Sequence, residues 1–143
     1  MIKDEIGFLS EWTAWYELQG FDRVIFYDNN STSSFEEIQP WIDSGFVTIR
    51  SQWGDWDKSE KLYGNTSDKF YATMRLKVLA EIDCKMRAIE LGIEIFVSVD
   101  LDEYLMPTTS DMLVIDELVS WFNKTTRGMV VISKLQFLPG IVS

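Results

Sequence analysis

Apolar residues recur every three or four positions in four stretches of the chain, and this spacing is typical of amphipathic helices. The first stretch is followed by Gly20, the residue type that most readily ends a helix. Its apolar face is expected to meet the core and comprises Phe8, Leu9, Trp12, Trp15 and Tyr16. The four predicted helices cover residues 6–19, 35–43, 68–91 and 111–123.

Details of the sequence refine these helices. Pro40 falls inside the second helix and should kink or shorten it, because proline lacks a backbone N–H. Ser33 or Ser34 can cap the second helix, and Ser110 can cap the fourth. The third helix has one apolar stripe, made of Phe70, Met74, Val78, Ile82, Met86 and Ile89.

Short runs of β-branched and aromatic residues alternate with the helices and predict strands. Residues 51–67, between the second strand and the third helix, are expected to form a long loop. Regular alternation of helices and strands is typical of an α/β domain with a mainly parallel sheet. The predicted strands cover residues 23–27, 46–50, 93–99 and 128–137.

The strand expected at residues 93–99 ends abruptly in acidic residues, Asp100, Asp102 and Glu103. Ligands of open α/β sheets bind just beyond the carboxyl ends of the strands. Crowded carboxylates repel one another, so a divalent cation that holds them ionised explains the cluster well. Mn²⁺ or Mg²⁺ would suit the oxygen atoms of Asp100 and Asp102. An ordinary acidic turn between strand and loop is the alternative explanation.

A second polar strand end follows residues 23–27, where Asp28 and Asn29 begin a cluster of turn-forming residues. If both strands run parallel, both ends lie at one edge of the sheet and can share a ligand. The first end suits hydrogen bonds to a base or a ribose, and the acidic end suits a cation that bridges a diphosphate. A nucleotide-diphosphate ligand is therefore expected.

Composition narrows the class of protein. The 143 residues are enough for one domain, and a hydrophobic content of 46% indicates a substantial core. A net charge of −10 disfavours binding to nucleic acid or anionic membranes. The single cysteine, Cys84, and the lack of histidine exclude an internal disulfide, a multi-cysteine zinc site and Ser-His-Asp catalysis. The sequence contains no run of 18 apolar residues, the length that a membrane-spanning helix needs, and no targeting signal is visible.

Several short motifs over residues 3–107 resemble glycosyltransferase family 92, formerly the DUF23 domain, and its family 2-like relatives. Each motif alone is weakly specific, but their order and spacing together are more so. The motifs are Lys3-Asp4-Glu5, Phe26-Tyr27-Asp28-Asn29-Asn30-Ser31-Thr32-Ser33, Asp43-Ser44-Gly45, Asp83-Cys84, and Val99-Asp100-Leu101-Asp102-Glu103-Tyr104-Leu105 with Pro107.

The resemblance implies a Rossmann-like GT-A fold and the metal-dependent transfer of a sugar, typically galactose from UDP-galactose, to a glycan hydroxyl. It implies that Asp28 and Asn29 contact uridine and that Asp4 and Glu5 lie beside the nucleotide. Asp100 and Asp102 would form a D-x-D motif that holds ribose, diphosphate and metal. A eukaryotic protein of this kind would act in the Golgi lumen as part of a membrane-anchored chain, and a bacterial one in the cytoplasm.

The chain departs from the family pattern in two ways. Ser33 stands where such motifs usually have a second Asp. The expected single domain, residues 1–143, is predicted to lack most of its first strand and the acceptor-binding part. The catalytic base is therefore not assigned; Glu103 is expected to pack beside the metal site.

Four helical residues have open roles. Asp83 is expected either in solvent or in contact with the site. Arg75 and Lys77 could reach a diphosphate, although charges on helices are usually solvated. Cys84 is expected to be a buried small apolar residue.

Two other functions stay open. A haloacid dehalogenase-like phosphatase also has a D-x-D after a strand, but Glu103-Tyr104 does not fit its motif. The other alternative is a non-catalytic module that binds a nucleotide-sugar or a cation.

Overall fold

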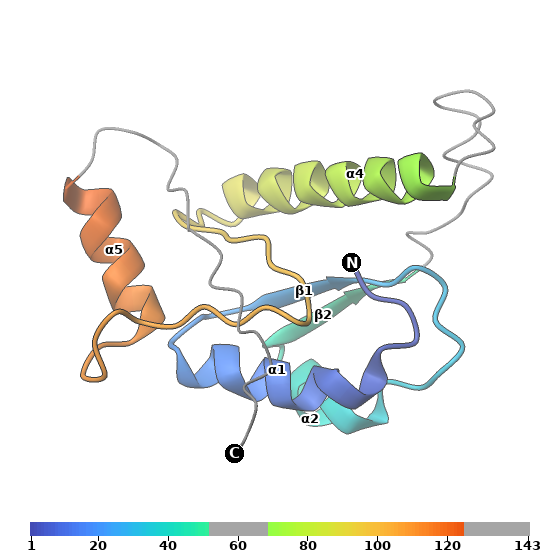
Figure 1. Cartoon of the computed structure of the whole chain (residues 1–143), viewed down its shortest axis with the longest axis horizontal. Coiled ribbons are helices and arrows are strands. Elements are labelled where there is room, and N and C mark those ends of the chain that lie inside the picture. Colours follow the sequence, from blue (N-terminus) through green and yellow to red (C-terminus); the bar gives the residue numbers. More distant parts are fainter. Residues whose placement is uncertain (52–68, 125–143) are drawn as a thin grey trace, which may run out of the picture.

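The computed structural model describes residues 1–51 and 69–124 and shows a mixed α/β arrangement (Figure 1). The predicted strand at residues 128–137 and nearly all of the predicted loop at 51–67 lie outside the described residues. None of the described helices is long and apolar enough to cross a membrane. The elements are α1 (Ile6–Leu18), β1 (Val24–Tyr27), η1 (Glu36–Ile38), α2 (Gln39–Asp43), β2 (Val47–Arg50), α4 (Lys69–Glu90) and α5 (Val114–Lys124).

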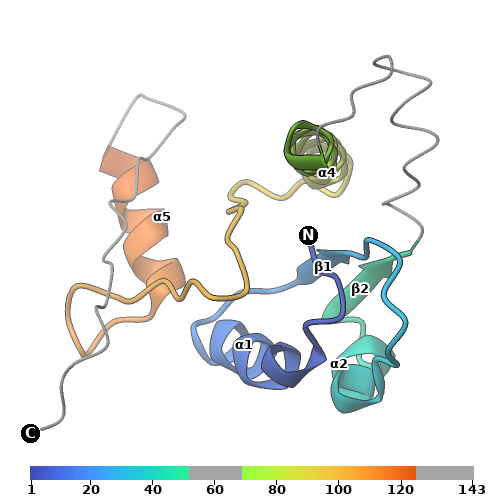
Figure 2. The same cartoon turned by 45° about the vertical axis from the view of Figure 1, so that its right-hand side comes forward.

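A small parallel sheet lies at the centre of the described residues. β1 pairs with β2 in parallel, from Val24 opposite Val47 to Tyr27 opposite Arg50. On the other edge of β1, Ile2 forms a single parallel bridge with Asp28. α4 covers one face of this sheet, and α1 and α2 lie on the other, as Figures 1 and 2 both show. The predicted parallel α/β class is therefore confirmed for these elements.

The main core forms between the sheet and α1. The apolar face of α1 supplies Leu9, Trp12 and Tyr16, which are buried as predicted, whereas Phe8 is exposed and Trp15 is half-buried. Trp12 packs against Tyr16 and against Phe26 of β1, so α1 is fixed to the sheet by its aromatic side chains. The buried residues of this core cluster are Ile2, Leu9, Trp12, Tyr16, Val24, Phe26, Ile38 and Val47.

Gly20 ends α1 as the sequence predicts, with a φ of +83° that favours glycine. A second constraint acts there, because a Cβ atom on Gly20 would lie 2.5 Å from Ile115 of α5. α5 begins beside this turn, where the Val114 N–H donates to the side-chain oxygen of Gln19. The predicted helix start at residue 111 was therefore too early, and the first N–H group of α5 is bound by Gln19, just after α1, rather than by Ser110.

Pro40 shortens the second predicted helix, as one of the two expectations had it, and does not kink it. The 3₁₀ turn η1 ends at Ile38, and α2 then begins with Pro40 in its first turn. Proline is well tolerated in this position because the first N–H groups of a helix have no partner within it. Neither helix shows a side-chain cap bond, so the predicted caps at Ser33 and Ser34 were wrong.

Residues 93–99 do not form the buried strand that their sequence predicts. Their backbone is irregular, and Ile93 and Phe96 are exposed. A strand needs a neighbour to complete its backbone hydrogen bonds, and the described residues show only the single bridge of Ile2 on the nearby edge of β1. The strand prediction is wrong here. The sequence pattern reports the β-propensity of these residues, but it does not show whether a neighbouring strand is present to pair with them.

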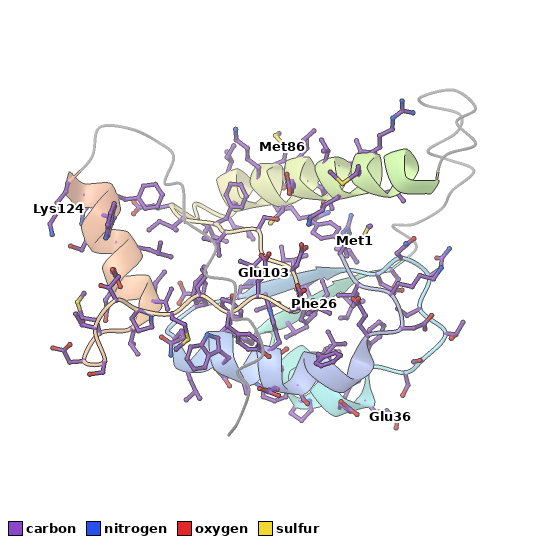
Figure 3. All side chains as sticks on the ribbon, in the orientation of Figure 1. Met1, Phe26, Glu36, Met86, Glu103 and Lys124 are labelled. Carbon is purple, nitrogen blue, oxygen red and sulfur yellow. The ribbon has the colours of Figure 1, made fainter. Side chains whose placement is uncertain are left out.

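The apolar stripe of α4 faces away from the sheet. Its described side chains are between 47% and 64% exposed, and Figure 3 shows Met86 on the outer side of the helix. The inner face instead has Leu76, Ala80 and Ala88, which are buried, among polar residues. The inner face is therefore less apolar than the outer one. The exposed stripe residues are Met74, Val78, Ile82, Met86 and Ile89.

This orientation of α4 can be tested with two glutamates. Ala80→Glu places a charged group at a position that is 5% exposed, and we expect a loss of at least about 2 kcal/mol in the free energy of unfolding. Ile82→Glu lies on the outer face and should change the free energy of unfolding by about 0.5 kcal/mol or less. Urea unfolding measures both, and equal losses would mean that the stripe is buried.

Candidate functional site

The acidic residues gather on one tight turn after residue 99. The Glu103 N–H donates to the Asp100 carbonyl at 3.0 Å, and the Asp100 N–H donates to the Glu103 carboxylate at 3.3 Å. These bonds fold the chain back, so that Asp100, Asp102 and Glu103 each offer an oxygen within 4.8 Å of the others. The turn lies between α4 and α1, where Figure 3 labels Glu103.

Aromatic residues of α1 hold this turn by its backbone. The indole N–H of Trp12 donates to the carbonyls of both Asp100 and Glu103, each at 3.2 Å. The hydroxyl of Tyr16 donates to the Glu103 carbonyl and accepts the Leu105 N–H. Burial raises the pKa of Tyr16 to about 12, so this hydroxyl keeps its proton at neutral pH. The carboxylates therefore project from a turn whose backbone is fixed.

The second predicted strand end is also built around carboxylates. Asp28 is 6% exposed, and its side chain accepts the Ser31 N–H at 2.9 Å. Asp4 accepts hydrogen bonds from the N–H and the hydroxyl of Thr32, and its own N–H donates to Ser31. The bonds from Thr32 hold the pKa of Asp4 below its ordinary value. Asp28 and Asp4 thus order the loop after β1, and both are also candidate contacts of the nucleotide.

Backbone bonds place Asn29 and Glu5 near the same strand end. The Asn29 N–H donates to the Ile2 carbonyl at 2.9 Å, beside the bridge between Ile2 and Asp28. Glu5 is exposed at the start of α1. The residues predicted at the first strand end therefore lie together around the end of β1, whereas a ligand that they share with Asp100 stays a prediction.

α4 is joined to the sheet by Asp83, whose role the sequence left open. Asp83 accepts hydrogen bonds from the Tyr27 hydroxyl and from Arg87, both at 2.8 Å, and Arg50 lies 3.8 Å away. Burial by itself would raise the pKa of Asp83, but the bonds from Arg87 and Tyr27 outweigh it and hold the pKa below its ordinary value. Asp83 is a structural link to both strands, and only its i,i+4 spacing from Arg87 was visible in the sequence.

A cavity of about 150 Å³ lies beside the acidic turn, between β1, the inner face of α4 and residues 93–101. Its lining includes Ile25, Val97 and Cys84. Burial raises the pKa of the Cys84 thiol, which keeps it protonated and poorly nucleophilic. This agrees with the expectation of an unreactive lining residue, but Cys84 is half-buried rather than buried.

The acidic turn is suited to a divalent metal ion. Mn²⁺ and Mg²⁺ prefer carboxylate oxygens, and two ligands of such an ion lie at most about 4 Å apart when each bond is about 2.1 Å. The three oxygens lie within 4.8 Å of one another, and small side-chain rotations would bring them to this spacing, since Asp102 is exposed. Asp100, Asp102 and Glu103 thus fit the hard cation that the sequence predicts.

Comparison with known proteins defines the family. Residues 5–138 match the model of glycosyltransferase family 92, which is most of the chain. A rice protein (Oryza sativa subsp. japonica) that is named as a glycosyltransferase family 92 protein is 31% identical over 61 residues. That match covers 43% of this chain and 10% of the rice protein. No solved structure matches the chain significantly. The chain belongs to glycosyltransferase family 92, and the resemblance seen in its motifs is confirmed.

The clamp on the acidic turn leads to a prediction about Trp12. Trp12→Phe removes the donor to two carbonyls and should lower the free energy of unfolding by about 1–3 kcal/mol. Trp15 donates to one carbonyl, that of Leu105, and is half-buried, so Trp15→Phe is a milder control. Denaturant unfolding compares the two. Equal losses would show that the two contacts of Trp12 stabilise the protein no more than the single bond of Trp15 does.

Asp83 should make stability depend on pH. Its pKa is lower in the folded state than the ordinary value of 3.8, so its contribution is present above about pH 4 and is lost as the pH falls through the folded value. Asp83→Asn should therefore cost most near pH 7 and progressively less on acidification. Unfolding measured from pH 2.5 to 7 tests this, with the exposed Asp22→Asn as the control. A constant cost at every pH would contradict it.

Proposed function

We propose that this chain is the nucleotide-sugar part of a metal-dependent glycosyltransferase. The reaction would move a sugar, with galactose from UDP-galactose as the first candidate, to a hydroxyl of a glycan or another carbohydrate. Membership of family 92 supports the reaction class. The observation that best supports the site is the convergence of Asp100, Asp102 and Glu103 on a turn that α1 fixes at the edge of a parallel sheet.

In this proposal Asp100 and Asp102 hold Mn²⁺ or Mg²⁺, and Glu103 helps to shape the turn. The cation would supply positive charge for the diphosphate that leaves when the sugar is transferred. The hydrogen bonds of Trp12 and Tyr16 keep the carboxylates together before the cation arrives. A fixed turn reduces the reorganisation that binding requires, and this favours affinity.

The loop after β1 is the proposed nucleotide-binding part. Asp28 and Asn29 would contact the uridine, Asp4 and Glu5 would lie beside the nucleotide, and Asp100 would also contact the donor. Support comes from the bonds that order this loop, because a loop already folded loses little entropy on binding.

For the fold, we propose that residues 1–143 belong to one Rossmann-like GT-A domain. The parallel pairing of β1 with β2 and the helices on both faces of the sheet support this assignment. The chain spans about a tenth of the rice relative it matches, so the acceptor, the base and the partners of the whole protein are proposals about a longer chain. In a eukaryote we place its activity in the Golgi lumen, and in a bacterium in the cytoplasm.

One assay separates this function from its rivals. The protein is incubated with UDP-galactose, Mn²⁺ and a carbohydrate acceptor, and separately with a generic phosphate ester. A glycosyltransferase domain without its acceptor-binding part releases UDP by slow hydrolysis of the donor, whereas a phosphatase releases inorganic phosphate from the ester. A binding module retains the nucleotide and releases neither product. Family membership favours the first outcome.

The metal assignment predicts the effect of Asp102→Asn. The variant should lose at least about tenfold in Mn²⁺-dependent binding of a UDP-sugar, because it lacks one charged ligand. Its fold should be intact, since Asp102 is exposed. Calorimetry measures the binding, and Asp116→Asn, an exposed change on α5, is the matched control. Unchanged metal-dependent binding in Asp102→Asn would show that this D-x-D does not hold the metal.

A further inference from the structure

Lys77 of α4 forms an ion pair with Asp100, which is one of the proposed metal ligands. Its ammonium group donates to the carboxylate of Asp100 at 2.6 Å. Both side chains are about half-exposed, at 36% for Lys77 and 44% for Asp100. Charge-assisted hydrogen bonds of this length are among the stronger ones in proteins. Lys77 is therefore more than a solvated charge on the helix surface.

Two contacts join α4 to the residues around Asp100, and the spacing of the contacting residues is similar in the two segments. Glu81, four residues after Lys77, accepts a hydrogen bond from Ser98, two residues before Asp100. Four residues of a helix rise about 6 Å, and alternate residues of an extended chain are about 6.6 Å apart. Val99 and Leu101 lie against the core cluster instead. This alternation directs Asp100 toward Lys77.

A divalent cation and the Lys77 ammonium compete for the same carboxylate. Both are positive, so they repel each other at the separation that shared binding to Asp100 would impose. The four-carbon stem of lysine is flexible and can withdraw its charge.

We propose that Lys77 is an internal counter-ion of the acidic turn, which a divalent cation displaces from Asp100 and which then binds the diphosphate of the donor. This inference rests on the proposed function, because it takes the acidic turn as the cation site. Before the cation arrives, Lys77 offsets one of three neighbouring negative charges. Afterwards the displaced ammonium lies beside the cation, where the diphosphate adds negative charge.

The proposal predicts effects of opposite sign for one variant. Lys77→Met keeps the length of the side chain and removes its charge. Without nucleotide, it should bind Mn²⁺ about fivefold more tightly, the modest change expected for a half-exposed ion pair. At saturating Mn²⁺, it should bind UDP about tenfold more weakly, because a charged donor to the diphosphate is gone. A residue that only supports the fold would move both affinities in the same direction.

Calorimetry on the full chain measures both affinities, with two further variants as controls. Lys77→Arg keeps the charge and should stay nearer the parent in both titrations. Lys85→Met removes an exposed charge from the same helix and should match the parent. It also shifts the net charge equally, so a general electrostatic effect of the charge change would appear in Lys85→Met as well.

Each outcome bears on a different conclusion. Opposite shifts in Lys77→Met alone support the proposal, and so does Mn²⁺ binding that only this variant shows. A second outcome has the parent binding both Mn²⁺ and UDP. If Lys77→Met then binds Mn²⁺ no more tightly than the parent, or binds UDP with the affinity of the parent, the role of Lys77 is overturned. The proposed function stands in that case. If neither protein binds Mn²⁺, the cation site is wrong, and the proposal for Lys77 is overturned with it.

Discussion

The paired hydrogen bond from Trp12 is the interaction on which the candidate site depends. A single indole N–H lies between two carbonyls that are three residues apart, so one donor fixes both ends of the acidic turn. Trp12 is itself buried against Phe26 of β1, and the position of the turn is therefore set by the sheet. Like charges would otherwise drive the carboxylates apart, and the backbone clamp opposes this without neutralising them.

Elements that depend on local spacing were predictable from the sequence. α1 and α4 follow the repeat of their apolar residues, and Gly20 and Gly92 both adopt the positive φ expected at a helix end. The face that α4 presents to the sheet was not predictable. Its inner positions combine alanines with Lys77 and Asp83, whose partners are distant in sequence, so the more apolar stripe misleads.

The same distinction separates the two parts of the site. Asp100, Asp102 and Glu103 are neighbours in the chain, and their clustering follows from the sequence alone. The bond from Trp12 to Asp100 joins residues 88 positions apart, and the bond from Tyr27 to Asp83 joins residues 56 apart. Such pairs form only when distant segments of the chain meet, so no local sequence pattern predicts them. For residues 93–99, composition was a good guide to β-propensity but could not supply a neighbouring strand.

The alternation of Ser98 and Asp100 with Val99 and Leu101 has a consequence for how this segment can vary in evolution. Insertion or deletion of one residue between Ser98 and Asp100 would break the spacing that places Ser98 at Glu81 and Asp100 at Lys77. One of these two contacts with α4 would then be lost. The segment should accordingly tolerate changes of residue type much better than changes of length, and relatives that keep the acidic turn should keep its distance from Ser98.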